Sequence, residues 1–203
     1  QDMVDVYAWG QGDGPTVSGG WCYGWNSGDC GDNSVSQWAA IGFMAAERYW
    51  GIATPNWVKE HNLLWVAHSA GGSGFGYTGP GDGEATTPSG MVQLACDDVS
   101  STNALWLHGE NYLANNWNSI MSVNNVYANY AIAKALRSAN PPVHNLALNG
   151  KDWFRDPING LARTTIDRQR LDGTWLGSGR GYDNDIQEAT AWSTIILSSS
   201  LFQ

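Results

Sequence analysis

The segment at residues 19–42 begins with GGWCYG at 19–24 and ends with NSVSQWAAIG at 33–42. It joins a glycine-rich aromatic loop to a run of small and apolar residues that favours a helix. The same order returns as DGTW at 172–175 and EATAWSTIIL at 188–197. In both copies the helix tryptophan follows the loop tryptophan by 17 residues, from Trp21 to Trp38 and from Trp175 to Trp192. A repeated unit of this kind predicts side-by-side helical hairpins.

Two further copies lie between these. GFGY at 74–77 is followed by TPSGMVQL at 87–94, with Met91 in place of the helix tryptophan, and an alanine-rich run at 125–136 lacks the glycine loop. No alternating pattern of strand length competes with the helical pattern. We therefore predict one all-α domain over residues 1–203, built of helical hairpins with long glycine-rich loops at one end.

Helix positions follow from apolar spacing and from capping pairs. We expect helices at about 34–50, 55–69, 88–98, 102–117, 123–138, 156–170 and 185–200. Thr54-Pro55, Thr87-Pro88 and Asp156-Pro157 each place a capping oxygen before a proline suited to the first helical position. Most tryptophans lie in or beside apolar stripes, such as the one that runs from Trp38 to Tyr49, and are expected to fill space between hairpins.

The composition excludes several functional classes. The 203 residues carry 10 Lys and Arg against 19 Asp and Glu, a formal net charge of −9. Because nucleic-acid binding needs clustered basic residues, no DNA or RNA partner is expected. No run of about 18 apolar residues occurs, so no transmembrane segment is predicted. Charged residues make up only 14% of the chain, which leaves a neutral aromatic surface typical of protein interfaces.

The cysteines point to an oxidising compartment. Cys22 and Cys30 bracket a short loop that a disulfide can staple, although the sequence leaves their pairing open. Cys96 stands between apolar neighbours and is expected to be an inert buried thiol. The chain begins at Gln1, which fits a processed polypeptide among other origins. We expect an extracellular, cell-surface or periplasmic protein.

The residues of the repeat resemble a known superfamily. Gly20-Trp21 with Gln37-Trp38, and Gln169 with Gly173, Trp175 and Trp192, are similar to the Gln and Gly-x-Trp elements of the prenyltransferase and squalene-cyclase repeat proteins. The resemblance implies an α/α toroid of helical hairpins, in which such side chains tie neighbouring helices together. It does not extend to catalysis, because the DxDD motif, the zinc motif and the Cys-Gly-Glu-Gln segment of that superfamily are missing. The chain is also too short for six hairpins, so an open ring, or a fragment of a longer chain, is expected.

If the glycine-rich loops emerge at one end, they form an aromatic and acidic rim. We predict a binding rim of Trp21, Tyr23, Trp25, Phe75, Tyr77, Trp175 and Tyr182. The accompanying acids are Asp13, Asp29, Asp32, Asp82, Glu84, Asp172, Asp183 and Asp185.

The loop acids permit two kinds of site. Loop carboxylates are ligands that Ca²⁺ prefers, which makes Asp29, Asp32, Asp183 and Asp185 candidate calcium ligands, and calcium is the one cofactor considered. The same residue types also form ordinary turns. A pair among Asp29, Asp82, Glu84 and Asp185 would instead suit glycoside hydrolysis.

The expected function is a non-catalytic binding or structural assembly module that contacts a protein partner or further copies of itself. The alternative is an enzyme that acts on an isoprenoid or a carbohydrate, in a central cavity or at the acidic rim.

Overall fold

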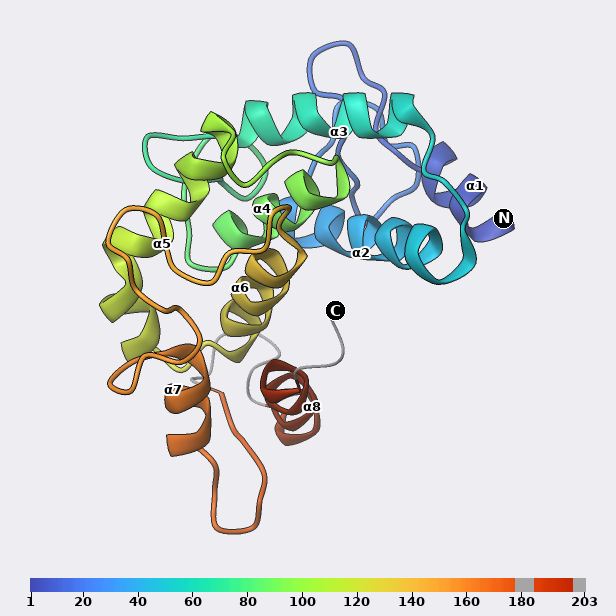
Figure 1. The fold of residues 1–203 in the computed structure, drawn as a ribbon. Coiled ribbons are helices and arrows are strands. Elements are labelled where there is room, and N and C mark those ends of the chain that lie inside the picture. Colours follow the sequence, from blue (N-terminus) through green and yellow to red (C-terminus); the bar gives the residue numbers. More distant parts are fainter. Residues whose placement is uncertain (178–184, 199–203) are drawn as a thin grey trace.

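The protein is all-helical in the part of the chain that the computed structural model describes, residues 1–177 and 185–198. Those residues contain no β-strand, only isolated bridges such as that between Asp13 and Ser18. The helices, shown in Figure 1, are α1 (Asp2–Trp9), α2 (Asn33–Trp50), α3 (Asn56–Ser69), α4 (Thr86–Cys96), α5 (Ala104–Ser122), α6 (Val126–Ser138), α7 (Leu161–Asp167) and α8 (Ile186–Leu197).

The helices form two layers. The inner helices α2, α4, α6 and α8 follow one another in space, each packed against the next. The outer helices are α1, α3, α5 and α7. Helix α1 packs on α2, both α3 and α5 pack on α4, and α7 packs on α8. Figure 1 shows α3, α5 and α7 along the outside of a curve whose inside is formed by the inner helices. Each outer helix precedes an inner one in the chain, so the fold is a series of hairpins bent into an arc.

Six of the seven predicted helices lie close to their expected positions, but the capping prediction is wrong. The helix starts capped by a side chain are those at Asp32, Asn103, Asn125 and Asp185. Thr54 makes no cap, and its buried Oγ1 has no hydrogen-bond partner among the described residues. A proline near a helix start fixes one backbone angle, but it does not supply the side-chain acceptor that a cap needs.

The remaining predicted helix, at 156–170, is observed as the shorter helix α7, and helix α1 was not predicted. The Asp156 carboxylate accepts the N–H groups of Ile158 and Asn159, each at 3.0 Å, and this forms a turn instead of a first helical turn. The helix then begins only at Leu161. Ile158 is exposed, so it does not belong to a buried stripe.

A buried asparagine joins three helices and a loop. Asn33 accepts from Trp65 Nε1 at 2.9 Å and from Gln93 Nε2 at 2.8 Å. Its own Nδ2 donates to Ser69 Oγ at 2.9 Å and to the Gly76 carbonyl at 2.7 Å. All four hydrogen-bonding positions of this amide are therefore filled, which is the condition under which a buried polar group adds to specificity.

The starts of the inner helices are linked to one another in the same way. Asn33 of α2 binds the loop before α4, and Asn125 at the start of α6 donates to Glu84 of that loop at 2.8 Å. Asn124 donates to the carbonyl of Leu176 in the loop before α8 at 2.6 Å. Asparagine amides thus join neighbouring repeats at the beginnings of their inner helices. None of the described helices combines the length and the apolar character that a membrane span requires.

Candidate functional site

The two loop tryptophans have equivalent contacts in the first and last hairpins. Trp21 donates its indole Nε1–H to the carbonyl of Tyr7, near the end of α1, at 2.8 Å. Trp175 donates its Nε1–H to the carbonyl of Thr165, near the end of α7, at 2.7 Å. Both side chains are buried, at 4% and 7% exposure. Each indole therefore joins a loop to the outer helix that precedes it.

The backbone at the same positions is bound to the following inner helix. The N–H of Trp21 donates to Ser36 Oγ at 2.8 Å, and that of Trp175 donates to Thr190 Oγ1 at 3.1 Å. Phe75 of the second copy donates to Thr87 Oγ1 at 3.1 Å, and its ring is fully buried. The predicted binding rim is therefore wrong for Trp21, Phe75 and Trp175, because their side chains hold hairpins together.

The other predicted rim aromatics remain available to solvent. Tyr23 is 82% exposed, and Trp25 and Tyr77 are about half exposed. Tyr182 lies outside the described residues. A binding role for Tyr23, Trp25 and Tyr77 stays a prediction.

Three of the four predicted calcium ligands, Asp29, Asp32 and Asp185, accept hydrogen bonds from backbone N–H groups. Asp29 accepts the N–H groups of Thr16 and Val17, each at 2.7 Å, and these bonds hold its pKa below the usual value. Asp32 caps α2 and Asp185 caps α8, while Asp183 lies outside the described residues. Residues 1–177 and 185–198 contain no group of three or more His, Cys, Asp or Glu placed to hold a metal.

The carboxylates considered for glycoside hydrolysis are also engaged in loop contacts. Asp82 accepts from Ser73 Oγ at 2.8 Å, and Glu84 accepts from Asn125 Nδ2. Asp29 and Asp185 bind backbone N–H groups, as described above. These hydrogen bonds give each acid a structural role in its own loop.

Both cysteine predictions agree with the structure. Cys22 and Cys30 form a disulfide across the loop between α1 and α2. Cys96 is buried at the end of α4, and this burial raises the pKa of its thiol well above the usual value.

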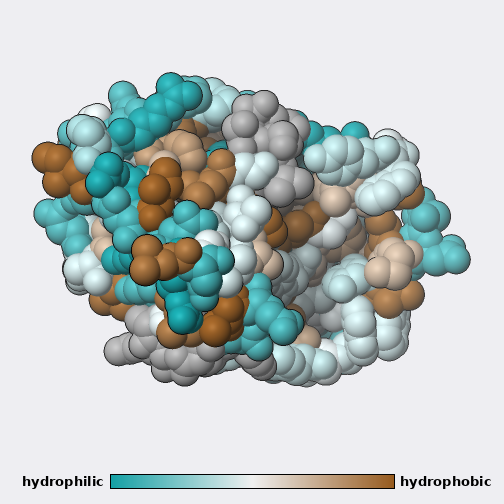
Figure 2. Space-filling view, turned by 90° about the horizontal axis from the view of Figure 1, so that it is seen from below, coloured by the Kyte–Doolittle hydropathy of each residue, from teal (hydrophilic) through white to brown (hydrophobic). Residues whose placement is uncertain are grey.

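A groove lies at the other ends of the inner helices. It has a volume of about 990 Å³ and is formed by the last turns of α2, α4 and α6 together with the segment 139–155. The face of the molecule seen in Figure 2 is hollowed near its middle, with hydrophobic residues in the hollow. The lining residues used below are Ile41, Glu47, Arg48, Tyr49, Asp98, Lys134, Arg137, Asp152, Trp153, Phe154 and Arg155.

Basic residues are concentrated in this groove. Its lining includes Arg48, Lys134, Arg137 and Arg155, although the whole chain has only ten Lys and Arg. Arg48 and Arg155 are exposed, and neither forms an ion pair with a described residue. The groove therefore holds four of the ten Lys and Arg residues of an acidic protein.

The acidic residues of the groove form ion pairs or hydrogen bonds with neighbouring groups. Lys59 Nζ lies 2.9 Å from Glu47 Oε1 and 2.7 Å from Asp98 Oδ2. Burial raises the pKa of Glu47, but the Thr54 N–H and the Lys59 ammonium outweigh it, so the pKa lies below the usual value. Asp152 accepts the N–H groups of the two residues that follow Trp153. Arg48 and Arg155 consequently have no ion-pair partner in the part of the chain that the structure describes.

The rings of Trp153 and Phe154 form an aromatic wall of the groove. The Arg137 guanidinium lies over the rings of Phe154 and Trp153, at 4.8 and 5.9 Å from their centroids. Trp153 Nε1 donates to the carbonyl of Val143 at 2.7 Å, so its ring has a fixed position. Arg137 also donates to the carbonyls of Ile196 and Ser198, which joins the end of α6 to the end of α8.

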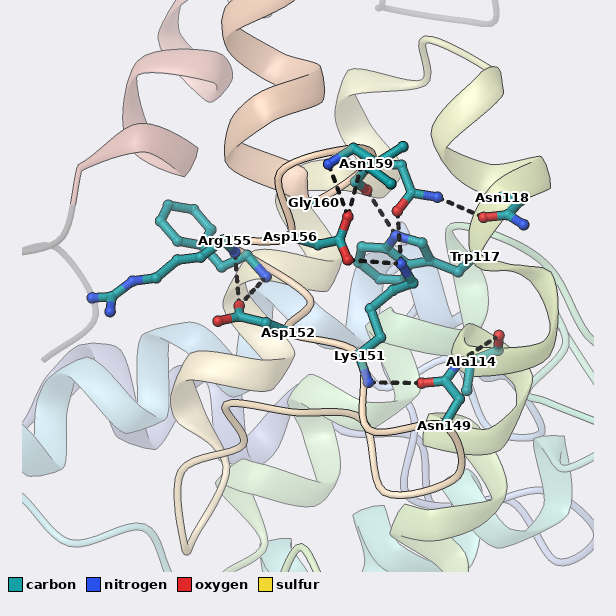
Figure 3. Close-up of polar contacts among 12 residues, drawn as sticks. Ala114, Trp117, Asn118, Asn149, Lys151, Asp152, Arg155, Asp156, Asn159 and Gly160 are labelled. Carbon is teal, nitrogen blue, oxygen red and sulfur yellow. Dashed lines mark hydrogen bonds and ion pairs between the residues drawn. The ribbon is translucent and has the colours of Figure 1, made fainter.

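A polar network, drawn in Figure 3, holds this wall against α5. Lys151 Nζ donates to Asn159 Oδ1 at 2.7 Å and to Asp156 Oδ2 at 3.2 Å. The carbonyl of Asn159 accepts from Trp117 Nε1 of α5 at 2.8 Å. Asp152 lies beside this cluster and fixes the turn that leads to Arg155. The aromatic wall is therefore positioned by the loop's own hydrogen bonds and by one outer helix.

The most unusual group of the groove is Lys134. Its side chain is 1% exposed, and its Nζ donates to Gln37 Oε1 at 3.2 Å. The Nζ also lies 4.4 Å from the ring centroids of both Trp38 and Tyr130. No carboxylate of the described residues lies within ion-pair distance of it. Burial alone holds the pKa of Lys134 well below its usual value.

The balance of energies lowers the pKa of Lys134. A cation–π contact stabilises an ammonium by about 0.5–2 kcal/mol. The desolvation of an ion without a charged partner costs several kcal/mol. The second effect is the larger, so the amine gives up its proton more readily than an ordinary lysine does.

Sequence reasoning missed the groove, although one signal was present. The stripe from Trp38 through Ile41 to Tyr49 was expected to face a core. Instead Trp38 is 41% exposed, Tyr49 is exposed, and Ile41 and Tyr49 line the groove. The buried face of α2 contains Ser36, Ala39, Ala40, Phe43 and Ala46. Helix α2 therefore carries apolar residues on two faces. One face packs on α4, and the other contributes Ile41 and Tyr49 to the groove.

Comparison with known proteins gives no match: no protein-family model, no curated protein and no solved structure matches the chain. The resemblance to the prenyltransferase and squalene-cyclase repeat superfamily therefore stays a prediction.

Proposed function

We propose that the chain is a non-catalytic binding module, built on an open α/α-toroid-like arc with its glycine-rich loops at one end. Its ligand lies in the groove at the opposite end and combines an anionic group with an apolar or aromatic body. The observation that carries this proposal is the composition of the groove lining, which combines the exposed residues Arg48 and Arg155 with the rings of Trp153 and Phe154. Guanidinium groups suit carboxylate, sulfonate and phosphate groups, and the rings suit a flat or apolar body.

The toroid-like arrangement is supported by the hydrogen bonds between repeats. Asparagine amides join the starts of the inner helices, and Arg137 joins the ends of α6 and α8. Neighbouring inner helices therefore run in the same direction, as hairpins around a common interior would. The loops before α2, α4 and α8 lead into the starts of these helices.

The disulfide and the exposed apolar residues support the rest of the proposal. A disulfide is typical of oxidising compartments, which fits a secreted, cell-surface or periplasmic protein. Met3, Val6 and Trp9 of α1 are exposed at one end of the arc. Exposed apolar groups of this kind suit contact with a protein partner or with a second copy of the chain.

The groove is tested with two fluorescent probes that share one aromatic body. 1-Anilinonaphthalene-8-sulfonate carries an anionic group, and N-phenyl-1-naphthylamine is the same molecule without it. We expect the double variant Arg48→Gln/Arg155→Gln to weaken binding of the sulfonate at least tenfold, or about 1.4 kcal/mol. Binding of the neutral probe should change little, because the aromatic wall is intact.

Arg163→Gln is the matched control, since Arg163 is exposed on α7 and pairs with Asp167 away from the groove. Equal losses for Arg163→Gln and the double variant would contradict a specific groove. Equal affinity of the native protein for the two probes would contradict an anionic ligand.

A further inference from the structure

Helix α1, at one end of the arc in Figure 1, exposes acidic and apolar side chains together. Its buried residues are Val4 and Ala8. The exposed residues of the helix are Asp2, Met3, Asp5, Val6 and Trp9. With about 3.6 residues per turn, these side chains fall on one side of the helix, and Trp9 lies between the two aspartates. Asp5 accepts from Gln1 Nε2 at 2.8 Å, and neither aspartate has an ion-pair partner among the described residues.

The opposite side of α1 is fixed to its own chain. The carbonyl of Tyr7 accepts from the Trp21 indole, and the Tyr7 ring lies 5.3 Å from the ring of Trp25 and 6.3 Å from that of Phe43, between centroids. Phe43 belongs to the buried face of α2, whereas Ile41 lines the groove. The lining of the groove contains no residue of α1. The exposed face of α1 and the groove are therefore two separate surfaces of one chain.

These two surfaces have complementary chemistry. The groove offers the exposed residues Arg48 and Arg155 together with the exposed ring of Tyr49 and the half-buried ring of Phe154. Guanidinium groups bind carboxylates through paired hydrogen bonds, and aromatic rings pack on an indole in stacked or edge-to-face geometry. The lengths agree as well. The groove follows residues 41–49 of α2, and both this stretch and the eight residues of α1 measure about 12 Å.

We propose that the groove of one copy binds the exposed face of α1 of a second copy, so that the chains associate head to tail. This inference rests on the proposed function and names the ligand of the groove. Asp2 and Asp5 supply the anionic group, and Trp9 with its aliphatic neighbours supplies the apolar body. Because two different surfaces meet, a linear assembly keeps a free α1 at one end and a free groove at the other. Association therefore continues beyond the dimer, into an open chain or a closed ring.

The test exchanges the charges of the two surfaces. Asp2→Lys/Asp5→Lys and Arg48→Glu/Arg155→Glu each place like charges opposite one another in the contact. We expect each double variant to weaken association at least about tenfold in sedimentation velocity. All four substitutions in one chain should restore association, because opposite charges then face one another again. Failure of the combined variant to associate more tightly than both double variants would overturn the proposal.

An equimolar mixture of the two double variants is the second arm. The native α1 of the groove variant meets the native groove of the α1 variant, so the mixture should associate although neither component does. A variant that had failed to fold would not be rescued in this way. The matched control is Arg163→Glu/Asp167→Lys, which reverses an exposed ion pair on α7 and should associate as the native chain does. A mixture that stays monomeric would contradict head-to-tail contact.

The sulfonate probe separates this proposal from the one on which it rests. 1-Anilinonaphthalene-8-sulfonate should compete with α1 for the groove and dissociate the native assembly, and Asp2→Lys/Asp5→Lys should still bind it. If Arg48→Glu/Arg155→Glu loses the sulfonate but associates as the native chain does, the anionic groove stands and α1 is not its ligand. If the same variant loses association but binds the sulfonate normally, the contact stands and the groove for a small anionic ligand is removed.

Discussion

At the scale of single residues, the environment of a side chain decides its chemistry more than its type does. Lys134 and Lys59 are both lysines, but burial lowers the pKa of the first while two carboxylates raise the pKa of the second. The pKa values of two aspartates, Asp29 and Asp97, are likewise shifted in opposite directions. Backbone N–H groups lower the pKa of Asp29, whereas burial raises the pKa of Asp97 to about 8.

Asp97 should make the stability of the protein depend on pH. Its ordinary pKa is 3.8, so between pH 4 and 8 the folded state keeps a proton that the unfolded state releases. A rise in pH across this window therefore destabilises the fold through this group. We expect Asp97→Asn to raise the free energy of unfolding at pH 8 by about 1–3 kcal/mol and to have little effect at pH 4. Urea unfolding at both pH values measures the difference.

The control is Asp167→Asn, an exposed acid on α7 whose loss should change stability by less than about 0.5 kcal/mol at either pH. An effect of Asp97→Asn that is the same at pH 4 and pH 8 would show that its carboxyl group titrates normally.

At the scale of elements, the loop tryptophans explain how a hairpin is closed. Trp21 and Trp175 lie 17 residues before their helix tryptophans, and both donate to the carbonyl of a residue near the end of the preceding outer helix. The spacing predicted a repeat but not this contact, because the distance along the chain from Trp21 to Tyr7 differs from that between Trp175 and Thr165. The shared feature is a spatial one.

The hydrogen bond from Trp175 should contribute measurably to stability. Trp175→Phe keeps an aromatic ring but removes the buried indole hydrogen bond, and it leaves the Thr165 carbonyl with the N–H of Arg168 as its donor. We expect a loss of about 1–3 kcal/mol in the free energy of unfolding. Trp50→Phe, at an exposed tryptophan, is the matched control and should cost less than about 0.5 kcal/mol. Equal losses for the two variants would contradict the role of the indole N–H.

At the scale of the whole molecule, α1 lies at one end of the arc. It packs on α2 and exposes Met3, Val6 and Trp9. Exposed apolar groups that lie close together suit contact with another surface.

Exposed apolar groups on α1 should promote association. We expect sedimentation velocity to show concentration-dependent association of the native chain below about 100 µM, the range of weak protein contacts. Val6→Lys/Trp9→Ser should abolish it, while Ile158→Lys, on an exposed turn elsewhere, should not. A native chain that stays monomeric over this range would remove self-assembly and leave a different protein as the partner.

The helical character, the order of the hairpins and a candidate Cys22–Cys30 disulfide are all predictable from the amino-acid sequence. These features depend on local periodicity, glycine punctuation and short separations, all of which are visible along the chain. Only the packing of the helices settles that Trp21 and Trp175 are buried, that Ile41 and Tyr49 line a groove, and that Lys134 is buried with no carboxylate of the described residues within ion-pair distance. Those features depend on contacts between helices, such as Lys134 with Gln37, and no pattern within one helix specifies which residue of another helix it will meet.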